Sequence, residues 1–416
     1  MQFKTIKLLF FLALFITGCF TPPIEAVQTP SQSVFRTHTV TPAHTPTELK
    51  IEMPGKVNTI IRSGLPINST RFNLESIAEG LFVPWSMVFT SPQRILVSER
   101  NGQIREIVGG QLNPQPLVSF LSVAVQDEAG LLGLALDPDY IHNQYLYACY
   151  TTSKDGMLVN RVVKLRDLGT ALEEVGIILD DIPAARYHAG GRLRFGADKK
   201  LYISTGDALQ PEQAQEGNLL VGKILRINAD GTIPDDNPFP RSPVYSLGHR
   251  NTQGMDWNPL NNLLYATEHG PSGFDGTPGG DEINLIQAGG NYGWPLVSHT
   301  EKKEGLTPPL VEFSPAVAPG SGMFYTGDLF LQFNGNFFFG GLVGEGIYRV
   351  IFSAENPAEI LLIDKLEIGV GRIRDVVQGP DGAIYFTTSN RDGRGLVRKG
   401  DDKVYRLSPL PYRDDR

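Results

Sequence analysis

Four polar clusters along the chain contain the side chains best suited to chemistry. The first is Tyr187-His188-Ala-Gly-Gly-Arg192, in which small residues leave the histidine free to face solvent. A histidine flanked by small residues lies close to the backbone, so His188 is a candidate site residue. The same pattern is also typical of an ordinary loop histidine or of one that supports Arg192.

Two further clusters combine cations and amides. Arg250 and Asn251 lie in Gly248-His-Arg-Asn-Thr-Gln-Gly254, where fixed donors would suit an anionic or quinone oxygen. Arg372 and Arg374 alternate, so in an extended segment both point to one side and favour a polyanionic ligand. The alternatives are a turn held by side-chain hydrogen bonds for the first pair and solvated surface arginines for the second.

The remaining cluster is rich in oxygen ligands. The segment 268–273 contains Gly270 and Pro271, and the segment 279–282 adds neighbouring carboxylates. Carbonyl and carboxylate oxygens are the ligands that Ca²⁺ prefers, although irregular turns with capping carboxylates would look the same. The seven histidines lack the spacing of a zinc site, and neither a phosphate-binding loop nor a nucleophile elbow is present.

The elements that must position these clusters recur in pairs. From about residue 72, short apolar runs preceded by turn residues are each followed by a run that alternates apolar and polar residues, as half-buried strands do. The first runs are 94–100, 145–151, 201–207, 263–269, 336–342 and 383–389. The second runs are 102–108, 160–166, 222–228, 281–287, 346–352 and 402–408.

Six copies of one strand pair predict an all-β fold, a six-bladed β-propeller. The strand candidate 72–80 has no second run of its own, so we expect it to pair with the last blade and close the ring. Two ordinary domains in tandem would not explain the regular repetition. A propeller binds ligands at the mouth of its channel, which would bring the four clusters to one site.

The first residues form a targeting segment. Lys4 and Lys7 precede a short apolar run at 8–16, and Cys19 follows in a sequence that resembles a bacterial lipobox. An ordinary cleaved signal peptide with a chance cysteine is the alternative. We therefore expect a lipoprotein signal peptide at 1–19, lipidation of Cys19, a flexible Thr/Pro/Ser-rich tether at 20–70, and the propeller at 71–416.

Charge and cysteine content bear on the partners and the location of the protein. The chain has 416 residues and a net charge of −8, which argues against nucleic acid as a partner. The expected location is the outer face of a bacterial cell membrane, held by a lipid anchor, or the periplasm. With Cys19 lipidated, Cys149 has no partner and is expected to be a buried thiol.

An ordered series of motifs from about residue 80 to 408 resembles the soluble PQQ-dependent glucose/sorbosone dehydrogenase family, and the aldose sugar dehydrogenase branch is the more similar. The series comprises Val83-Pro-Trp-Ser86, Glu128-AGLLGLALDPDY, His188-AGGRLRFG, Gly222-KILRIN, Leu247-GHRNTQG, Glu268-HGP, Asp281-EINLI, Gly289-GNYGWP and Arg372-IRDV. The resemblance implies a six-bladed propeller that oxidises the C1 hydroxyl of aldoses to the lactone, with PQQ and Ca²⁺ as cofactors and an unidentified electron acceptor.

Carried over by motif, the resemblance also implies roles for individual residues. His188 would be the general base, with Arg250 beside it as a catalytic and cofactor-binding donor. The other implied cofactor-binding residues are Asn251, Arg372, Arg374 and Glu128, and the carbonyls of Gly270 and Pro271 would bind Ca²⁺.

Three positions depart from the glucose-oxidising branch. Tyr187 replaces an Asp and Glu128 replaces a Gln, which indicates a different sugar preference or a looser site. Val343 replaces a Lys that helps to bind PQQ, so one cation is missing. Two alternatives follow: a non-catalytic binding propeller that has lost the cofactor, and a metal-dependent lactonase-type propeller, against which the arginines at 372 and 374 argue.

Overall fold

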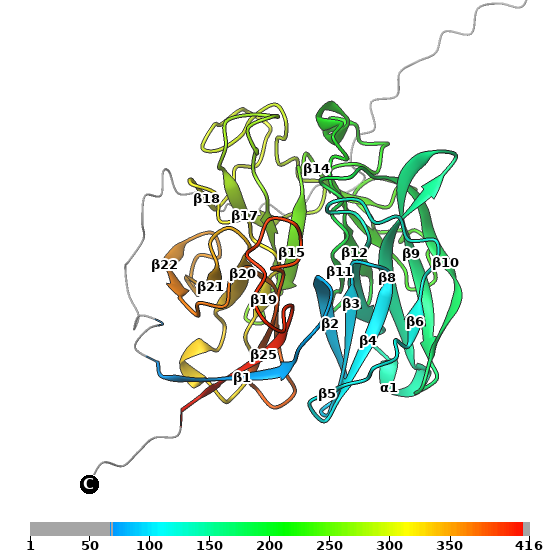
Figure 1. The fold of residues 1–416 in the computed structure, drawn as a ribbon. Helices are drawn as coiled ribbons and strands as arrows, with labels where there is room; N and C mark the ends of the chain where they lie inside the picture. The colour runs from blue at the N-terminus through cyan, green and yellow to red at the C-terminus, as the bar shows by residue number, and fades with distance from the viewer. Residues whose placement is uncertain (1–66, 68–69, 411–416) are drawn as a thin grey trace, which may run out of the picture. The chain divides into compact units, whose positions relative to one another are not determined.

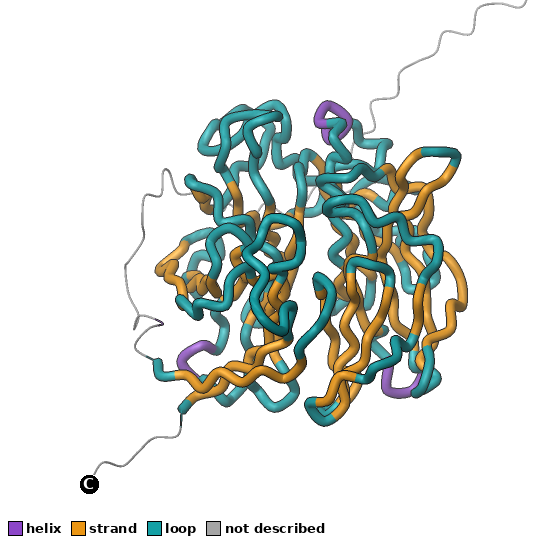
Figure 2. Tube along the Cα trace, in the orientation of Figure 1, coloured by secondary structure: helices purple, strands orange, loops and turns teal. Residues whose placement is uncertain are grey.

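The structure is a computed structural model that describes Ile67 and residues 70–410. Strands and loops dominate these residues (Figure 2), and the helical segments include α1 (Tyr140–Asn143) and the 3₁₀ turns Pro211–Gln215 and Leu331–Phe333. The predicted signal peptide, the lipidated Cys19 and nearly all of the predicted tether lie outside the described residues. None of the helices in the described part of the chain has the length and hydrophobicity that a bilayer crossing requires.

Six antiparallel sheets follow one another along the chain and form the blades of a propeller. Blade 1 contains β2 (Pro84–Ser91), β3 (Arg94–Glu99), β4 (Gln103–Val108), β5 (Gln111–Leu112) and β6 (Val118–Ser119). Blade 2 contains β7 (Leu131–Leu136), β8 (Tyr145–Lys154), β9 (Met157–Asp167) and β10 (Leu172–Pro183). Blade 3 contains β11 (Leu193–Phe195), β12 (Leu201–Ser204), β13 (Lys223–Ile227) and β14 (Val244–Leu247).

The second half of the chain repeats this arrangement. Blade 4 contains β15 (Thr252–Trp257), β16 (Leu264–Glu268), β17 (Asp281–Ile286) and β18 (Val311–Phe313). Blade 5 contains β19 (Met323–Phe324), β20 (Phe337–Gly341), β21 (Gly346–Phe352) and β22 (Ile360–Leu366). Blade 6 contains β23 (Ile373–Gln378), β24 (Ile384–Thr388), β25 (Val404–Pro409) and β1 (Phe72–Ala78).

The predicted strand pairs are the two central strands of every blade. β3 pairs with β4, and the corresponding pairs of the other blades are β8–β9, β12–β13, β16–β17, β20–β21 and β24–β25. The prediction that the N-terminal strand closes the ring is also confirmed, because β1 lies antiparallel to β25 with Leu74 opposite Leu407 (Figure 1). The propeller is thus closed by strands from its two ends.

The first strand of each blade contacts the first strand of the next blade, all the way around the ring. Apolar side chains fill the space between neighbouring blades, such as Tyr147 and Cys149 of blade 2 against Ile203 and Leu225 of blade 3. The prediction that Cys149 is a buried thiol is confirmed, and burial raises its pKa to about 12. The loops between these tightly packed blades are therefore held at fixed places around the channel mouth.

Candidate active site

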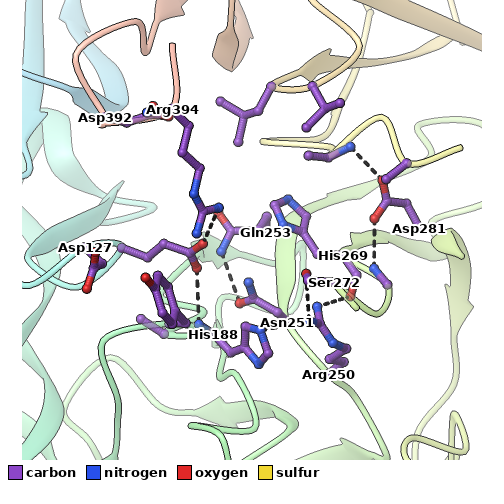
Figure 3. A pocket seen from close by; sticks show the side chains of 18 of the residues that line it. Asp127, His188, Arg250, Asn251, Gln253, His269, Ser272, Asp281, Asp392 and Arg394 are labelled. Atoms are coloured by element: carbon purple, nitrogen blue, oxygen red, sulfur yellow. Dashed lines mark hydrogen bonds and ion pairs between the residues drawn. The ribbon is translucent and has the colours of Figure 1, made fainter. Parts of the chain in front are cut away.

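A cavity of about 630 Å³ lies at the meeting point of loops from all the predicted clusters (Figure 3). Every predicted cofactor-binding, catalytic and metal-ligand residue of the described chain lines it: Glu128, His188, Arg250, Asn251, Gly270, Pro271, Arg372 and Arg374. These residues come from the loop before β7, the connections between blades 2 and 3, 3 and 4, and 5 and 6, the β16–β17 loop and, for Arg374, the start of β23. Ring closure thus produces a single site from distant segments.

His188 is buried and held on both ring nitrogens. Its Nδ1 lies 2.8 Å from Oδ1 of Asp207, and its Nε2 lies 2.8 Å from Nη2 of Arg250. Because Arg250 can only donate, Nε2 is the acceptor and Nδ1 carries the proton that Asp207 accepts. The backbone of His188 is left-handed, with φ of 54°, and approaches Gly206 so closely that a Cβ there would lie 1.7 Å from the His188 carbonyl oxygen.

Asp207 is itself fixed by a second donor. The indole N–H of Trp294 donates to its Oδ2 at 2.8 Å, and the backbone N–H of Leu209 donates to its Oδ1. Asp207 therefore orients the imidazole of His188 rather than moving with it. The ring of Phe274 stacks against His188 with centroids 5.7 Å apart and shields one imidazole face.

The guanidinium of Arg250 donates hydrogen bonds to several neighbours that surround the histidine. Nε pairs with Asp275 at 2.7 Å, Nη1 donates to the carbonyl of His269 at 3.0 Å, and Nη2 also donates to Oγ of Ser272 at 3.1 Å. This fixed fork keeps a positive charge next to Nε2 of His188.

Asn251 directs a free donor into the cavity. Its Oδ1 accepts from the backbone N–H of Gly190 at 3.1 Å and from Nε2 of Gln253 at 3.2 Å, which sets the orientation of the amide. Its Nδ2 is buried and has no hydrogen-bond partner among the described residues. An unpaired buried donor is costly, so the position suits a ligand oxygen.

The carbonyls proposed for Ca²⁺ border the same cavity. Gly270 is held by its N–H, which donates to Asp281 at 2.8 Å, and Asp281 also accepts from the N–H groups of Val317 and Ala318. The Pro271 carbonyl accepts from the N–H of Gly279 at 3.2 Å and keeps a second lone pair. The described residues contain no group of three or more His, Cys, Asp or Glu side chains able to hold a metal.

Arg372 and Arg374 do lie on one side, as the alternation predicts, and they share one carboxylate. Nε of Arg372 donates to Asp392 at 2.8 Å, whereas Nη2 of Arg374 lies 3.8 Å from the same oxygen. Burial alone would raise the pKa of Asp392, but the two guanidiniums lower it below its usual value. Both arginines are buried rather than solvated, so the alternative of surface arginines is wrong.

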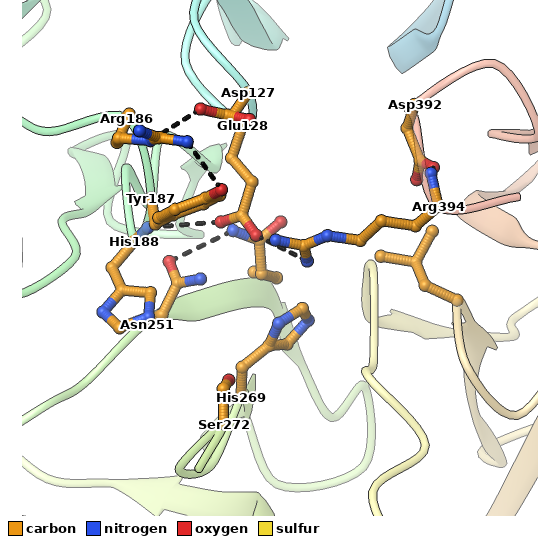
Figure 4. Close-up of polar contacts among 12 residues, drawn as sticks. Asp127, Glu128, Arg186, Tyr187, His188, Asn251, His269, Ser272, Asp392 and Arg394 are labelled. Carbon is orange, nitrogen blue, oxygen red and sulfur yellow. Dashed lines mark hydrogen bonds and ion pairs between the residues drawn. The ribbon is translucent and has the colours of Figure 1, made fainter. Parts of the chain in front are cut away.

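Glu128 and a residue absent from the sequence predictions, Arg394, meet at the cavity mouth (Figure 4). Oε1 of Glu128 lies 2.9 Å from Nη1 of Arg394, and Oε2 accepts from the backbone N–H of His188 at 3.2 Å. Tyr187 lies between the guanidiniums of Arg186 and Arg394, which are 4.7 and 5.4 Å from its ring centre. Val343 also lines the cavity and adds no charge.

Several residues of the site had no distinctive sequence signal. Asp207 ends a predicted strand run and Trp294 lies in the Gly289-GNYGWP motif, so both were within reach of the sequence. Asp392 and Arg394 lie in a turn with no recognisable pattern, and Arg100 ends the predicted run 94–100 without belonging to any of the polar clusters. They become site residues only because their loops converge on the channel.

Comparison with known proteins identifies relatives of this arrangement. Residues 81–398 match the family model described as glucose/sorbosone dehydrogenase. Aldose sugar dehydrogenase of Escherichia coli is 32% identical over 358 residues, which cover 78% of this chain and 92% of that protein. Quinoprotein glucose dehydrogenase B of Acinetobacter calcoaceticus is 33% identical over 270 residues, covering 57% of this chain and 55% of that protein.

A solved structure extends the comparison to the fold. The PQQ-bound aldose sugar dehydrogenase of Streptomyces coelicolor superposes with a TM-score of 0.72 at 32% sequence identity. The match covers 83% of this chain and 99% of that one. The propeller therefore has a structural counterpart that was solved with PQQ bound.

Proposed function

This chain belongs to the glucose/sorbosone dehydrogenase family, and from that membership we propose that it is a PQQ- and Ca²⁺-dependent dehydrogenase that oxidises the C1 hydroxyl of aldose sugars to the lactone. The observation that carries the proposal is the buried His188, with its Nδ1 fixed by Asp207 and its Nε2 left as the acceptor beside the cavity. The relatives described as aldose sugar dehydrogenases and as a quinoprotein add support.

The cavity fits an anionic quinone. Nδ2 of Asn251 is an orphaned buried donor, and Arg372 and Arg374 share a single carboxylate. In this proposal Asn251 and Arg250 would face the quinone oxygens, Arg372 and Arg374 would hold the cofactor carboxylates, and Glu128 would border the same ligand. The carbonyls of Gly270 and Pro271 would hold Ca²⁺ together with ligand oxygens.

The chemistry that the bound quinone supplies is the acceptance of two electrons, as a hydride from C1. His188 supplies the other half of the oxidation, because its Nε2 takes the proton of the C1 hydroxyl. Asp207 holds Nδ1–H throughout, so the imidazole keeps the tautomer and orientation that proton transfer requires, and it stabilises the imidazolium that forms.

The contact between Arg250 and His188 sets a condition on substrate binding. In the free protein, Nη2 of Arg250 donates to Nε2 of His188, the lone pair that must receive the proton. A bound sugar hydroxyl therefore has to take the place of that donor. Arg250 retains Asp275, Ser272 and the His269 carbonyl as partners, so it can release the histidine without losing its position.

The N-terminal expectations are part of the same proposal. Export, a lipid anchor at Cys19 and a tether up to residue 70 would place the propeller at the outer face of a bacterial cell membrane or in the periplasm. Electrons would then pass to an acceptor that the sequence does not name.

The alternatives differ in the observations that favour them. Val343, which lines the cavity without a charge, favours a binding propeller that has lost the cofactor, but Arg394 brings a cation to the same mouth. A lactonase-type metal site receives no support, because the described residues offer no cluster of acidic or histidine ligands.

The experiment that tests the proposal is reconstitution of the purified protein with PQQ and Ca²⁺, followed by dye reduction with a panel of aldoses. Sugar-dependent dye reduction that requires both additions is the expected result. A protein that neither binds PQQ nor reduces the dye would overturn the proposal, whereas binding without turnover would favour the non-catalytic alternative.

A further inference from the structure

Arg100 is a buried cation of the cavity that forms no ion pair with a carboxylate of the described residues. It follows β3 in blade 1, is 4% exposed, and lines the same cavity as Arg372 and Arg374. Its Nη1 donates to the backbone carbonyl of Asp127 at 2.8 Å. Its Nε is buried without a hydrogen-bond partner, and none of the described residues forms an ion pair with it.

The backbone around Arg100 holds the side chain in this position. Its N–H donates to the Val83 carbonyl, and its own carbonyl accepts from the N–H of Leu131, which joins blade 1 to blade 2. Gly130 lies against the arginine stem, where an added Cβ would be 2.5 Å from Cγ of Arg100. The guanidinium is therefore positioned by the fold rather than by a charged partner.

The charges nearby do not balance. Arg100, Arg372 and Arg374 face one carboxylate, Asp392, while Glu128 is already paired with Arg394. Burial lowers the pKa of Arg374, and the Arg100 guanidinium lowers it further, so these cations repel each other in the free protein. A buried cation without a partner is unfavourable, and a polyanion that entered would relieve two excess positive charges.

We propose that Arg100 is a third anion-binding arginine of this cavity and that, with Arg372 and Arg374, it holds a ligand carrying at least two carboxylates. The inference builds on the proposed function, in which that ligand is PQQ. Arg100 also supplies a cation to a cavity in which position 343 is a valine.

The test is equilibrium binding, measured by quenching of tryptophan fluorescence, because Trp85 lines the cavity. The probes are PQQ and benzene-1,3,5-tricarboxylate, a redox-inactive tricarboxylate, with benzene-1,3,5-trimethanol as the neutral counterpart. The variant is Arg100→Gln, and the control is Arg105→Gln, which removes a blade 1 arginine that is paired with Glu99 and lies outside the cavity lining.

We expect Arg100→Gln to weaken the binding of both anions by about 10- to 100-fold, because one charge-assisted contact is lost. The salt dependence of binding should fall for the same reason. Arg105→Gln should bind like the wild type, and the neutral triol should not bind. If Arg100→Gln does not fold, Arg100→Lys takes its place, and a several-fold loss is expected because lysine lacks the planar fork.

The outcomes separate this inference from the proposed function. Equal affinities of the wild type and the Arg100 variants for both anions would overturn the inference, but they would not contradict the proposed PQQ-dependent function. Arg100-dependent binding of the tricarboxylate without any binding of PQQ would support the anion site and remove the proposed cofactor. If the wild type bound neither PQQ nor the tricarboxylate, both the inference and the proposed function would be overturned.

Discussion

Oε1 of Glu128 lies 2.9 Å from Nη1 of Arg394, and this ion pair joins the loop before β7 to the loop between β24 and β25 across the mouth of the cavity. The other oxygen of Glu128 accepts from the backbone N–H of His188. One carboxylate thus connects the rim of the cavity to the residue proposed as the general base. The site is consequently tied together by contacts between blades as well as within them.

The Glu128–Arg394 pair makes stability depend on pH. Burial would raise the pKa of Glu128, but Arg394 and nearby histidines lower it below its ordinary value of 4.5. A lowered folded-state pKa means that the ionised carboxylate stabilises the fold above about pH 4.5, and that this contribution is lost as the pH falls through the folded pKa. Glu128→Gln should therefore lose less thermal stability than the wild type between about pH 6 and pH 3.

The matched control is Glu75→Gln, which removes an exposed carboxylate that pairs with Arg406 on blade 6. This variant should follow the wild-type pH profile closely, since exposed pairs contribute little. An acid profile of Glu128→Gln identical to that of the wild type would contradict the argument.

Asp207→Asn should slow turnover by about 100- to 10,000-fold, because an amide at that position no longer fixes the His188 tautomer. Binding of PQQ, measured by fluorescence, should change little. Asp139→Asn is the control, since Asp139 forms the same kind of contact with His142 on the exposed surface. Unchanged turnover in Asp207→Asn would mean that His188 does not depend on the Asp207 carboxylate for its tautomer and orientation.

Arg192→Met should destabilise the whole propeller. The buried Arg192 pairs with Asp375 at 3.0 Å and donates to the carbonyls of Gln253 and Gly320, so a single side chain holds blades 3, 4, 5 and 6 together. Removing one member of a buried pair costs about 3 to 5 kcal/mol, because the other charge stays buried.

Chemical denaturation measures the effect of Arg192→Met on the free energy of unfolding. The double variant Arg192→Met/Asp375→Asn should recover part of the loss, since no unpaired charge remains. A single variant as stable as the wild type would mean that the ring does not depend on this contact.

Tyr187→Ala should raise KM for the sugar more than it lowers kcat. The Tyr187 ring lines the cavity between two guanidiniums, but the Nε2 that is proposed to accept the proton belongs to its neighbour His188. Steady-state kinetics with several aldoses would measure the separate effects on KM and kcat. Tyr187→Phe should have a KM close to that of the wild type, because it keeps the ring. A fall in kcat alone would indicate a direct role in the chemistry.

The sequence by itself determined the blades. Strand pairs within a blade are local, because a run followed by a turn pairs with the next run, so the central strands of all six blades could be predicted from pattern. The closing strand at 72–80 could be predicted because it has no second run of its own and pairs with the last blade instead. The clusters around His188, Arg250 and Arg372 could also be chosen, because they combine unusual residue types within a few positions. All of them line the cavity.

Only the tertiary structure decided which of these side chains meet and which further residues join them. Arg100 and Arg394 look ordinary in the sequence, and the pairing of Asp207 with His188 is not visible in it either, because the partners of all three lie on other loops or other blades. Contacts of this kind depend on how the closed ring brings its loops together, and hydrophobic periodicity carries no information about that geometry. The physical reason is that strand pairing within a blade is encoded locally, whereas the charge balance of the cavity is a sum over the whole ring.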